Sequence, residues 1–244
     1  GVETATFNSW AMSIIRKVVR GRPFFKFHNV PTFVEEIKFS EEILNALGGW
    51  VEKQKHALDI EVVEIFKKWP GQIKSWKKAE NKAILPRLKD FAHDIKESNL
   101  PKFDKDKCLE FLKRKIFDLE DYVQDIYKLL ADIVHLKNYL SPDTKLDSHL
   151  DYLKRLTEKN QAKNNLDYFD MSLILRLIQL KNGGLPDGSG GVVLLDHLVI
   201  DEAQDFGPVE FAIMMSSVSD KRQVTIVGDV AQKILSARKF IGWN

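Results

Sequence analysis

The sequence has little of several features that would narrow its class. Cys108 is the one cysteine among 244 residues, so the chain can form no internal disulfide. It contains no run of about 18 apolar residues and no Cys/His pair with metal-ligand spacing, so neither a membrane-spanning helix nor a structural zinc site is predicted. The 37 basic and 35 acidic residues nearly cancel, and a net charge of +2 does not by itself indicate a nucleic-acid partner.

The first residues also lack the features expected at the N-terminus of a complete or secreted protein. Gly1 is not an initiator methionine, and no basic segment followed by an apolar one marks a signal peptide. We therefore expect an excised part of a longer, cytoplasmic protein. With 44% apolar residues, this part should still bury a core of its own.

The C-terminal part has the pattern of an α/β sheet. Three short apolar runs, Val192–Leu195, Leu198–Ile200 and Val224–Val227, lack the alternation of half-buried strands and are typical of fully buried parallel ones. Between the last two, Pro208–Val218 is predicted to form a helix that begins at its proline. The predicted fold class is therefore α/β, with part of a parallel sheet and a large all-helical insertion.

The middle of the chain is almost entirely helical in pattern. Helices are predicted at Glu41–Trp69, Gln72–Ala79, Ala83–Asn99, Asp106–Leu140 and Asp167–Leu180. The fourth carries an apolar heptad seam: Leu109, Leu112, Ile116, Leu119, Val123, Ile126, Leu130 and Ile133. The seam predicts one long helix, either in the core of a bundle or in a projecting arm that reaches a partner protein.

Two short segments in this middle region place lysines beside tryptophans. Lys67-Lys68-Trp69 and Ser75-Trp76-Lys77-Lys78 have the composition of a surface that binds phosphates and stacks on bases. The alternative is that both tryptophans pack inward while the lysines are solvated, and the sequence favours this second interpretation.

Adjacent carboxylates follow the second apolar run. Asp201 and Glu202 come directly after Leu198–Ile200 and open the stretch Asp-Glu-Ala-Gln-Asp. Ligands of an open α/β sheet bind beyond the carboxyl ends of its strands, so this pair lies where a ligand is expected. One carboxylate can hold Mg²⁺ while its neighbour faces an attacking water, a division that nucleoside-triphosphate hydrolysis needs.

The third run ends in a second polar group. Gly228 and Asp229 follow Val224–Val227, and Gln232 comes three residues later. A glycine lets the backbone pass close to a phosphate. A neutral amide can bond a γ-phosphate oxygen and lose that bond after hydrolysis.

Taken together, Asp-Glu-Ala-Gln-Asp and Gly-Asp-x-x-Gln resemble motifs II and III of the UvrD/Rep-like superfamily 1A DNA helicases. The resemblance implies a RecA-like domain that uses ATP and Mg²⁺. It assigns Mg²⁺ binding to Asp201 and the general base to Glu202. Gln204 and Gln232 would couple the nucleotide to the DNA strand, and Gly228 and Asp229 would lie at the nucleotide.

A third stretch, Thr-Ala-Thr-Phe-Asn-Ser-Trp at positions 4–10, resembles motif Ib of the same helicases. This resemblance makes Thr6, Phe7 and Ser9 contacts of single-stranded DNA. The alternative is an ordinary turn into a helix, with Phe7 and Trp10 in the core.

The sequence also lacks some parts of the helicase pattern, and this limits the activity expected of the chain alone. The glycine-rich stretch 185–191 lacks the Gly-Lys-Ser/Thr ending of a phosphate-binding loop, so this chain alone is expected not to hydrolyse ATP. The aromatic residues that usually follow motif III are also missing. The expected organisation is residues 1–20 and 166–244 in a partial RecA-like core, and residues 21–165 in the helical insertion.

The predicted function is that of a piece of an ATP-dependent DNA helicase or translocase, completed by the remaining domains of its parent chain. The layout of the insertion is also similar to that of HelD-like proteins, which act on RNA polymerase. The alternative is therefore a helicase-derived ATPase that remodels such a protein partner. A third possibility is a helical interaction module without enzymatic activity.

Overall fold

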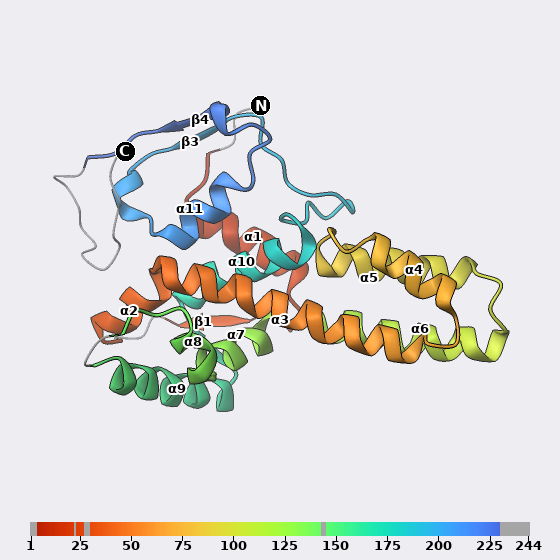
Figure 1. The fold of residues 1–244 in the computed structure, drawn as a ribbon. Helices are drawn as coiled ribbons and strands as arrows, with labels where there is room; N and C mark the ends of the chain where they lie inside the picture. Colours follow the sequence, from red (N-terminus) through yellow and green to blue (C-terminus); the bar gives the residue numbers. More distant parts are fainter. Residues whose placement is uncertain (1–3, 22, 27–29, 143–144, 230–244) are drawn as a thin grey trace.

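A computed structural model describes residues 4–21, 23–26, 30–142 and 145–229 of the chain (Figure 1). It is an α/β structure with short strands. The helices are α1 (Phe7–Val18), α2 (Thr32–Phe39), α3 (Glu41–Ile65), α4 (Pro70–Lys78), α5 (Ile84–Glu97), α6 (Lys102–Leu119), α7 (Tyr122–Ala131), α8 (Ile133–Lys137), α9 (Leu146–Ala162), α10 (Asp170–Asn182) and α11 (Pro208–Met215). The strands are β1 (Phe24–Lys26), β2 (Asn165–Asp167), β3 (Leu198–Ile200) and β4 (Val224–Ile226).

Helix α10 lies at the centre of the fold. It contacts α1, α3, α5, α7 and α11, and it is apolar around most of its circumference, as expected of a helix enclosed on all sides. Gly183 ends it in the left-handed conformation, with a φ of 75° that a glycine adopts without strain. Figure 1 shows α10 between the layer of β3, β4 and α11 and the helices on the opposite side.

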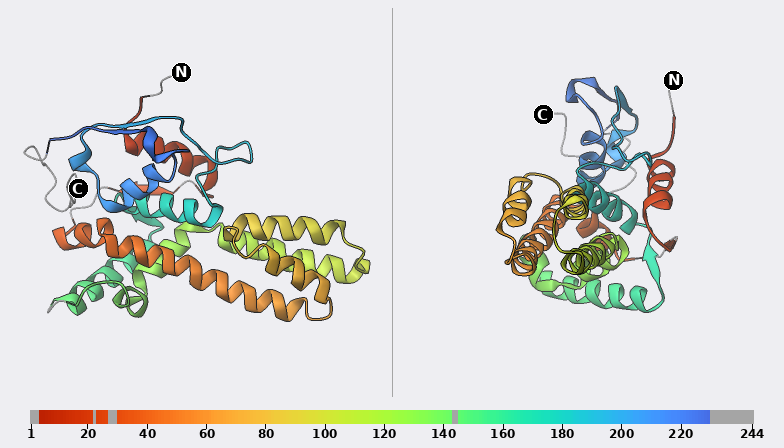
Figure 2. Two further views of the ribbon diagram at one scale, coloured as in Figure 1. Left: turned by 45° about the horizontal axis from the view of Figure 1, so that its top comes forward. Right: turned by 90° about the vertical axis from the view of Figure 1, so that its right-hand side faces the viewer.

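The second half of α3 forms an arm with α4, α5 and α6, which projects to one side of the molecule (Figures 1 and 2). Three residues hold α4 against its neighbours. The Trp76 indole donates to Asp59 at 2.7 Å, and Asp59 also pairs with Arg87 at 2.9 Å. The Arg87 guanidinium lies 3.7 Å from the centre of the Trp76 ring and donates to the Trp76 carbonyl. These contacts fix α4 to both α3 and α5.

The prediction of one long helix over Asp106–Leu140 is wrong, because the chain breaks twice and forms α6, α7 and α8. At each break an aspartate caps the next helix. Asp121 accepts from the Gln124 amide at 3.1 Å, and Asp132 accepts from the His135 amide at 3.0 Å. An aspartate side chain competes with the helical backbone for such amides, and the heptad count ignores this competition. The apolar seam nevertheless packs inward, although α6, which carries its first half, belongs to the projecting arm.

The four strands form two separate parallel pairs. β1 pairs with β2, and β3 pairs with β4 in the register Leu198↔Val224 and Ile200↔Ile226. The strand predicted at Val192–Leu195 is wrong, because this stretch forms only isolated bridges, Pro186↔Val192 and Leu195↔Val218. The Asp187 carboxylate accepts from the amides of Ser189 and Gly191 and turns the chain back before a ladder can form.

The pair β1–β2 was not predicted, since Phe24–Lys26 and Asn165–Asp167 are too short to show a periodicity. It brings the two ends of the helical region, residues 21–165, side by side. Among the described residues, no helix is long and apolar enough to cross a bilayer.

Buried charges attach α10 to the helical region at both ends. At its start, Lys38 of α2 lies 2.6 Å from Asp170 and 3.7 Å from Asp167, and all three side chains are almost fully buried. Burial raises the pKa of Asp170; the positive charge of Lys38 opposes this rise, and the negative charge of Asp167 adds to it. Near its end, Lys181 pairs with Asp125 and donates to the Leu119 carbonyl at 2.7 Å. Burial lowers the pKa of Lys181.

Candidate functional site

The pair β3–β4 brings the two predicted motifs to one edge. Hydrogen bonding continues beyond both strands, because Val227 donates to the Ile200 carbonyl at 2.8 Å and Ala203 donates to the Val227 carbonyl at 2.9 Å. Parallel strands end at the same edge, so the residues after Ile200 lie beside those after Ile226. Asp201 and Glu202 are therefore close to Gly228 and Asp229, as the sequence predicts.

Glu202 has an unusual backbone conformation at this edge. Its φ of 50° and ψ of 45° place it in the left-handed region, which costs a residue with a side chain roughly 1 kcal/mol or more. Its amide donates to the Asp201 carboxylate at 2.9 Å, which supports the turn. Both side chains are exposed, so this turn presents two adjacent carboxylates to solvent.

Gln204 connects the two strand ends beneath these carboxylates. Its side chain is buried; the amide nitrogen donates to the Glu202 carboxylate at 2.5 Å, and the amide oxygen accepts from the Asp229 backbone at 3.0 Å. A single side chain thus bonds one residue after β3 and one after β4. A shift of either strand end would be transmitted to the other through this amide.

At Gly228 the residues after β4 lie close to those after β3. A Cβ atom at this position would lie 2.5 Å from the Gln204 side-chain oxygen and 3.0 Å from the Ala203 backbone nitrogen. A larger residue would therefore displace the Gln204 side chain and crowd the Ala203 backbone. The glycine therefore allows the two predicted motifs to be in contact.

The N-terminal stretch lies near this edge through its aromatic residue. Thr6 caps α1 by accepting from the Ser9 amide at 3.2 Å, and the two hydroxyls also bond each other at 3.1 Å on the exposed surface. The Phe7 ring is only 8% exposed and lies edge-on to Phe206, with 5.9 Å between ring centres. The structure therefore places Phe7 in the core, Thr6 and Ser9 at the surface, and Trp10 between the two.

Sequence reasoning missed two residues of this region. Phe206 joins α1 to the end of the acidic stretch, and Glu210 accepts from the Gly207 amide at 2.9 Å to cap α11. The segment Gly207-Pro208-Val209-Glu210 could have revealed the cap, since a glutamate two residues after a helix-starting proline is a known pattern. Gln232, the remaining predicted site residue, lies outside the described residues.

The chemistry of this edge fits a magnesium-bound nucleotide. Mg²⁺ is commonly bound by one or two carboxylates together with waters and phosphate oxygens. The exposed Asp201 carboxylate offers a ligand of this kind at the edge. Within the part of the chain that the structure describes, no group of three or more His, Cys, Asp or Glu side chains forms a complete metal cage.

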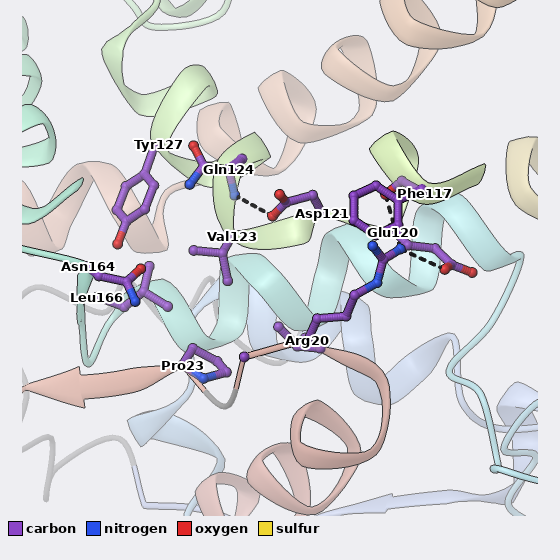
Figure 3. Close-up of a pocket in the computed structure, with 12 residues that line it drawn as sticks. Arg20, Pro23, Phe117, Glu120, Asp121, Val123, Gln124, Tyr127, Asn164 and Leu166 are labelled. Carbon is purple, nitrogen blue, oxygen red and sulfur yellow. Dashed lines mark hydrogen bonds and ion pairs between the residues drawn. The ribbon is translucent and has the colours of Figure 1, made fainter. Parts of the chain in front are cut away.

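A separate hollow of about 250 Å³ lies where the end of α1 meets α6 and α7 (Figure 3). The Arg20 guanidinium lies over the Phe117 ring at 3.7 Å and pairs with Glu120 at 3.1 Å. Its charge is satisfied by these neighbours, and none of the residues predicted from the motifs lines this hollow. The strand ends of β3 and β4 therefore remain the candidate site.

Comparison with known proteins identifies the family of the chain. The sequence model of the UvrD/REP helicase N-terminal domain matches residues 2–239, and the chain belongs to that family. A probable DNA helicase II homolog of Mycoplasma capricolum subsp. capricolum is 25% identical over 146 residues, which are 59% of this chain and 19% of that protein. The chain thus spans about a fifth of the length of this relative. No solved structure matches the chain.

Proposed function

We propose that this chain is the part of an ATP-dependent superfamily 1 DNA helicase or translocase that carries its metal-binding and general-base motif. The observation that supports the proposal most strongly is the contact between the two strand ends, where Gln204 bonds both Glu202 and Asp229. Membership of the UvrD/REP family supports a helicase motor. The contact made by Gln204 gives a physical reason why the two motifs would act together.

In this proposal the two exposed carboxylates have different tasks. Asp201 holds the Mg²⁺ ion of the nucleotide, and Glu202 accepts a proton from the attacking water. Bound Mg²⁺ supplies positive charge next to the phosphates. Gly228 and Asp229 face the nucleotide, and Gln232 bonds it as a reporter of hydrolysis.

Gln204 is the proposed positioning residue between nucleotide and DNA. A change at Glu202 on hydrolysis alters the bond to Gln204, which also holds the backbone of Asp229. On the N-terminal side, Thr6 and Ser9 contribute the exposed hydroxyls of a single-strand contact. Phe7, which we assigned to the same contact, links that surface to the acidic stretch through Phe206.

The proposed organisation keeps residues 1–20 and 166–244 in a RecA-like core and residues 21–165 in a helical insertion. The remaining domains of the parent supply the phosphate-binding lysine and the arginine that complete the site, so we expect the chain alone to be inactive. The alternative, a remodeller of RNA polymerase, needs an exposed apolar or mixed patch along the heptad helix. The seam is divided among three helices and is buried or partly buried along its length, and this favours the helicase proposal.

The test is ATP hydrolysis by the full-length protein, measured with and without single-stranded DNA. Glu202→Gln should lower the DNA-stimulated rate by at least roughly 100-fold, the usual size of a general-base contribution. Asp196→Asn, an exposed acid just before β3, is the matched control and should leave the rate unchanged. A Glu202→Gln rate equal to that of the wild type would refute the assignment.

A further inference from the structure

The acidic turn, which we define as residues 201–205, is followed by a close contact with α2. Gly207 directly precedes α11 and lies against Phe39, the last residue of α2. A Cβ atom at Gly207 would lie 3.1 Å from the Phe39 Cβ atom and 3.2 Å from the Phe39 carbonyl oxygen. Phe39 is 2% exposed and also packs edge-on against Phe169, with 5.6 Å between ring centres. The end of α2 therefore limits how far Gly207 can move toward it.

Phe39 is itself fixed by its two neighbours in sequence. Lys38 makes the buried pair with Asp170 at 2.6 Å, which attaches α2 to α10. Ser40 caps α3 by accepting from the Ile43 amide at 3.1 Å, so a single residue separates α2 from α3. Helix α3 continues into the arm, and α11 contacts both α2 and α3 (Figure 1). Phe39 therefore lies at a firm junction between the buried core and the base of the arm.

The acidic turn is also anchored at the strand end. The β3–β4 ladder continues as far as the Ala203 amide, and the Gln204 side chain bonds the Glu202 carboxylate. Two residues lie between Gln204 and Gly207, and close-packed interiors of this kind transmit displacements because they are hardly compressible. A shift of Gly207 would therefore move Gln204 and the Glu202 carboxylate bonded to it.

We infer that Phe39 is a positioning residue for ATP hydrolysis: it supports Gly207, and through Gly207 it holds the Glu202 carboxylate in place for the attacking water. The inference rests on the proposed function, which makes Glu202 the general base. Phe39 belongs to the helical region, residues 21–165, so the chemical step depends on an element outside the two motifs.

The expected defect lies in the chemical step and not in nucleotide binding. A general base must be within about 2.6 to 3.2 Å of the group whose proton it takes. A misplacement of about 1 Å can lower a rate by about 100-fold. Asp201 directly follows β3, and its position is set by the strand end. Loss of the support at Gly207 should therefore lower kcat and leave the KM for ATP nearly unchanged.

The test measures steady-state ATP hydrolysis by the full-length protein at saturating single-stranded DNA. The variant is Phe39→Ala, which removes every side-chain atom beyond Cβ from the contact with Gly207. The control is Phe33→Ala in the same helix, because the Phe33 ring stacks on His149 at 4.0 Å and meets Tyr152 of α9. Urea unfolding of both variants gives the conditions under which each is folded, and the rates are compared there.

Phe39→Ala should lower kcat at least about 10-fold, the effect of a displacement somewhat below 1 Å. Its KM for ATP and both constants of Phe33→Ala should stay within about 2-fold of the wild type, since only the transition state loses an interaction. In a Glu202→Gln background, Phe39→Ala should have no further effect, because the base that Phe39 positions is gone.

A second variant decides the matter if Phe39→Ala does not fold, as its circular dichroism would show. Gly207→Ala adds a Cβ atom that presses on Phe39 from the opposite side, at a φ of −93° that alanine adopts without strain. It should reproduce the fall in kcat, the nearly constant KM and the absence of an effect in the Glu202→Gln background.

Three results would overturn the inference: a wild-type kcat in the folded variant, an equal fall in kcat for Phe33→Ala, or an undiminished fall in the Glu202→Gln background. The proposed function fails separately, namely if Glu202→Gln hydrolyses ATP at the wild-type rate. A protein whose hydrolysis depends on Glu202 but not on Phe39 would therefore contradict only this inference.

Discussion

Ionisable residues are used in opposite ways at the strand ends and in the helical body. Asp201, Glu202 and Asp229 are exposed at one edge of β3–β4, while Lys38 and Asp170 are buried where α2 meets α10. Burying a charge is costly unless it is paired, and the second group is paired within the fold. The buried charges hold helices together, whereas the charges at the edge remain accessible to solvent.

The largest effect is expected from breaking the buried cluster. Lys38→Ala would leave Asp167 and Asp170 without a counter-charge, and loss of one partner of a buried pair costs about 3 to 5 kcal/mol. Urea unfolding of the purified protein measures this loss. Lys82→Ala, which removes an exposed pair with Asp90, should be indistinguishable from the wild type. Equal effects of the two substitutions would contradict the distinction between the regions.

The pH dependence of stability sharpens this result. Because the pKa of Asp170 is raised in the folded protein, its contribution to stability is present below the ordinary carboxyl pKa of about 3.9 and is lost as pH rises through the folded value. The stability advantage of the wild type over Asp170→Asn should therefore shrink as pH rises from about 4 to 7. An advantage that grows over this range would mean that Lys38 controls this titration.

A smaller effect is expected where the strand ends touch. Gly228→Ala should destabilise the protein by about 1 to 3 kcal/mol, the usual cost of overpacking, because its Cβ would collide with Gln204 and Ala203. It should also slow ATP hydrolysis. Gly71→Ala in α4, where the added carbon meets no atom within 4 Å, is the control and should not destabilise the protein. If both variants retain full stability, the close approach is not required.

The smallest effect concerns the break between α6 and α7. Asp121→Ala removes the cap of α7 and should cost about 1 kcal/mol in unfolding free energy. Asp118→Ala, an exposed position near the end of α6, should be neutral or slightly stabilising, because a negative charge there opposes the helix dipole. A loss at Asp118 as large as that at Asp121 would argue against capping as the cause of the break.

Elements with a strong local pattern could be predicted from the sequence. The positions of β3, β4 and α11 follow from two apolar runs and a proline, and the carboxylates after β3 lie at the edge that the parallel arrangement requires. The helix breaks at Asp121 and Asp132 were not predicted. Whether an aspartate caps a helix depends on which backbone amides its side chain reaches, and the heptad pattern does not show this. The pairing of β1 with β2 and the burial of Lys38 depend on contacts between residues more than 100 positions apart.

The central claim, that Asp201 and Glu202 have separate tasks at one nucleotide site, is tested most directly by nucleotide binding to the full-length protein with and without Mg²⁺. Glu202→Gln should bind Mg-ATP with a Kd within about 3-fold of the wild type, since a general base acts on the water. Asp201→Asn should lose the part of the affinity that depends on Mg²⁺. Identical effects of the two substitutions on binding would contradict the account.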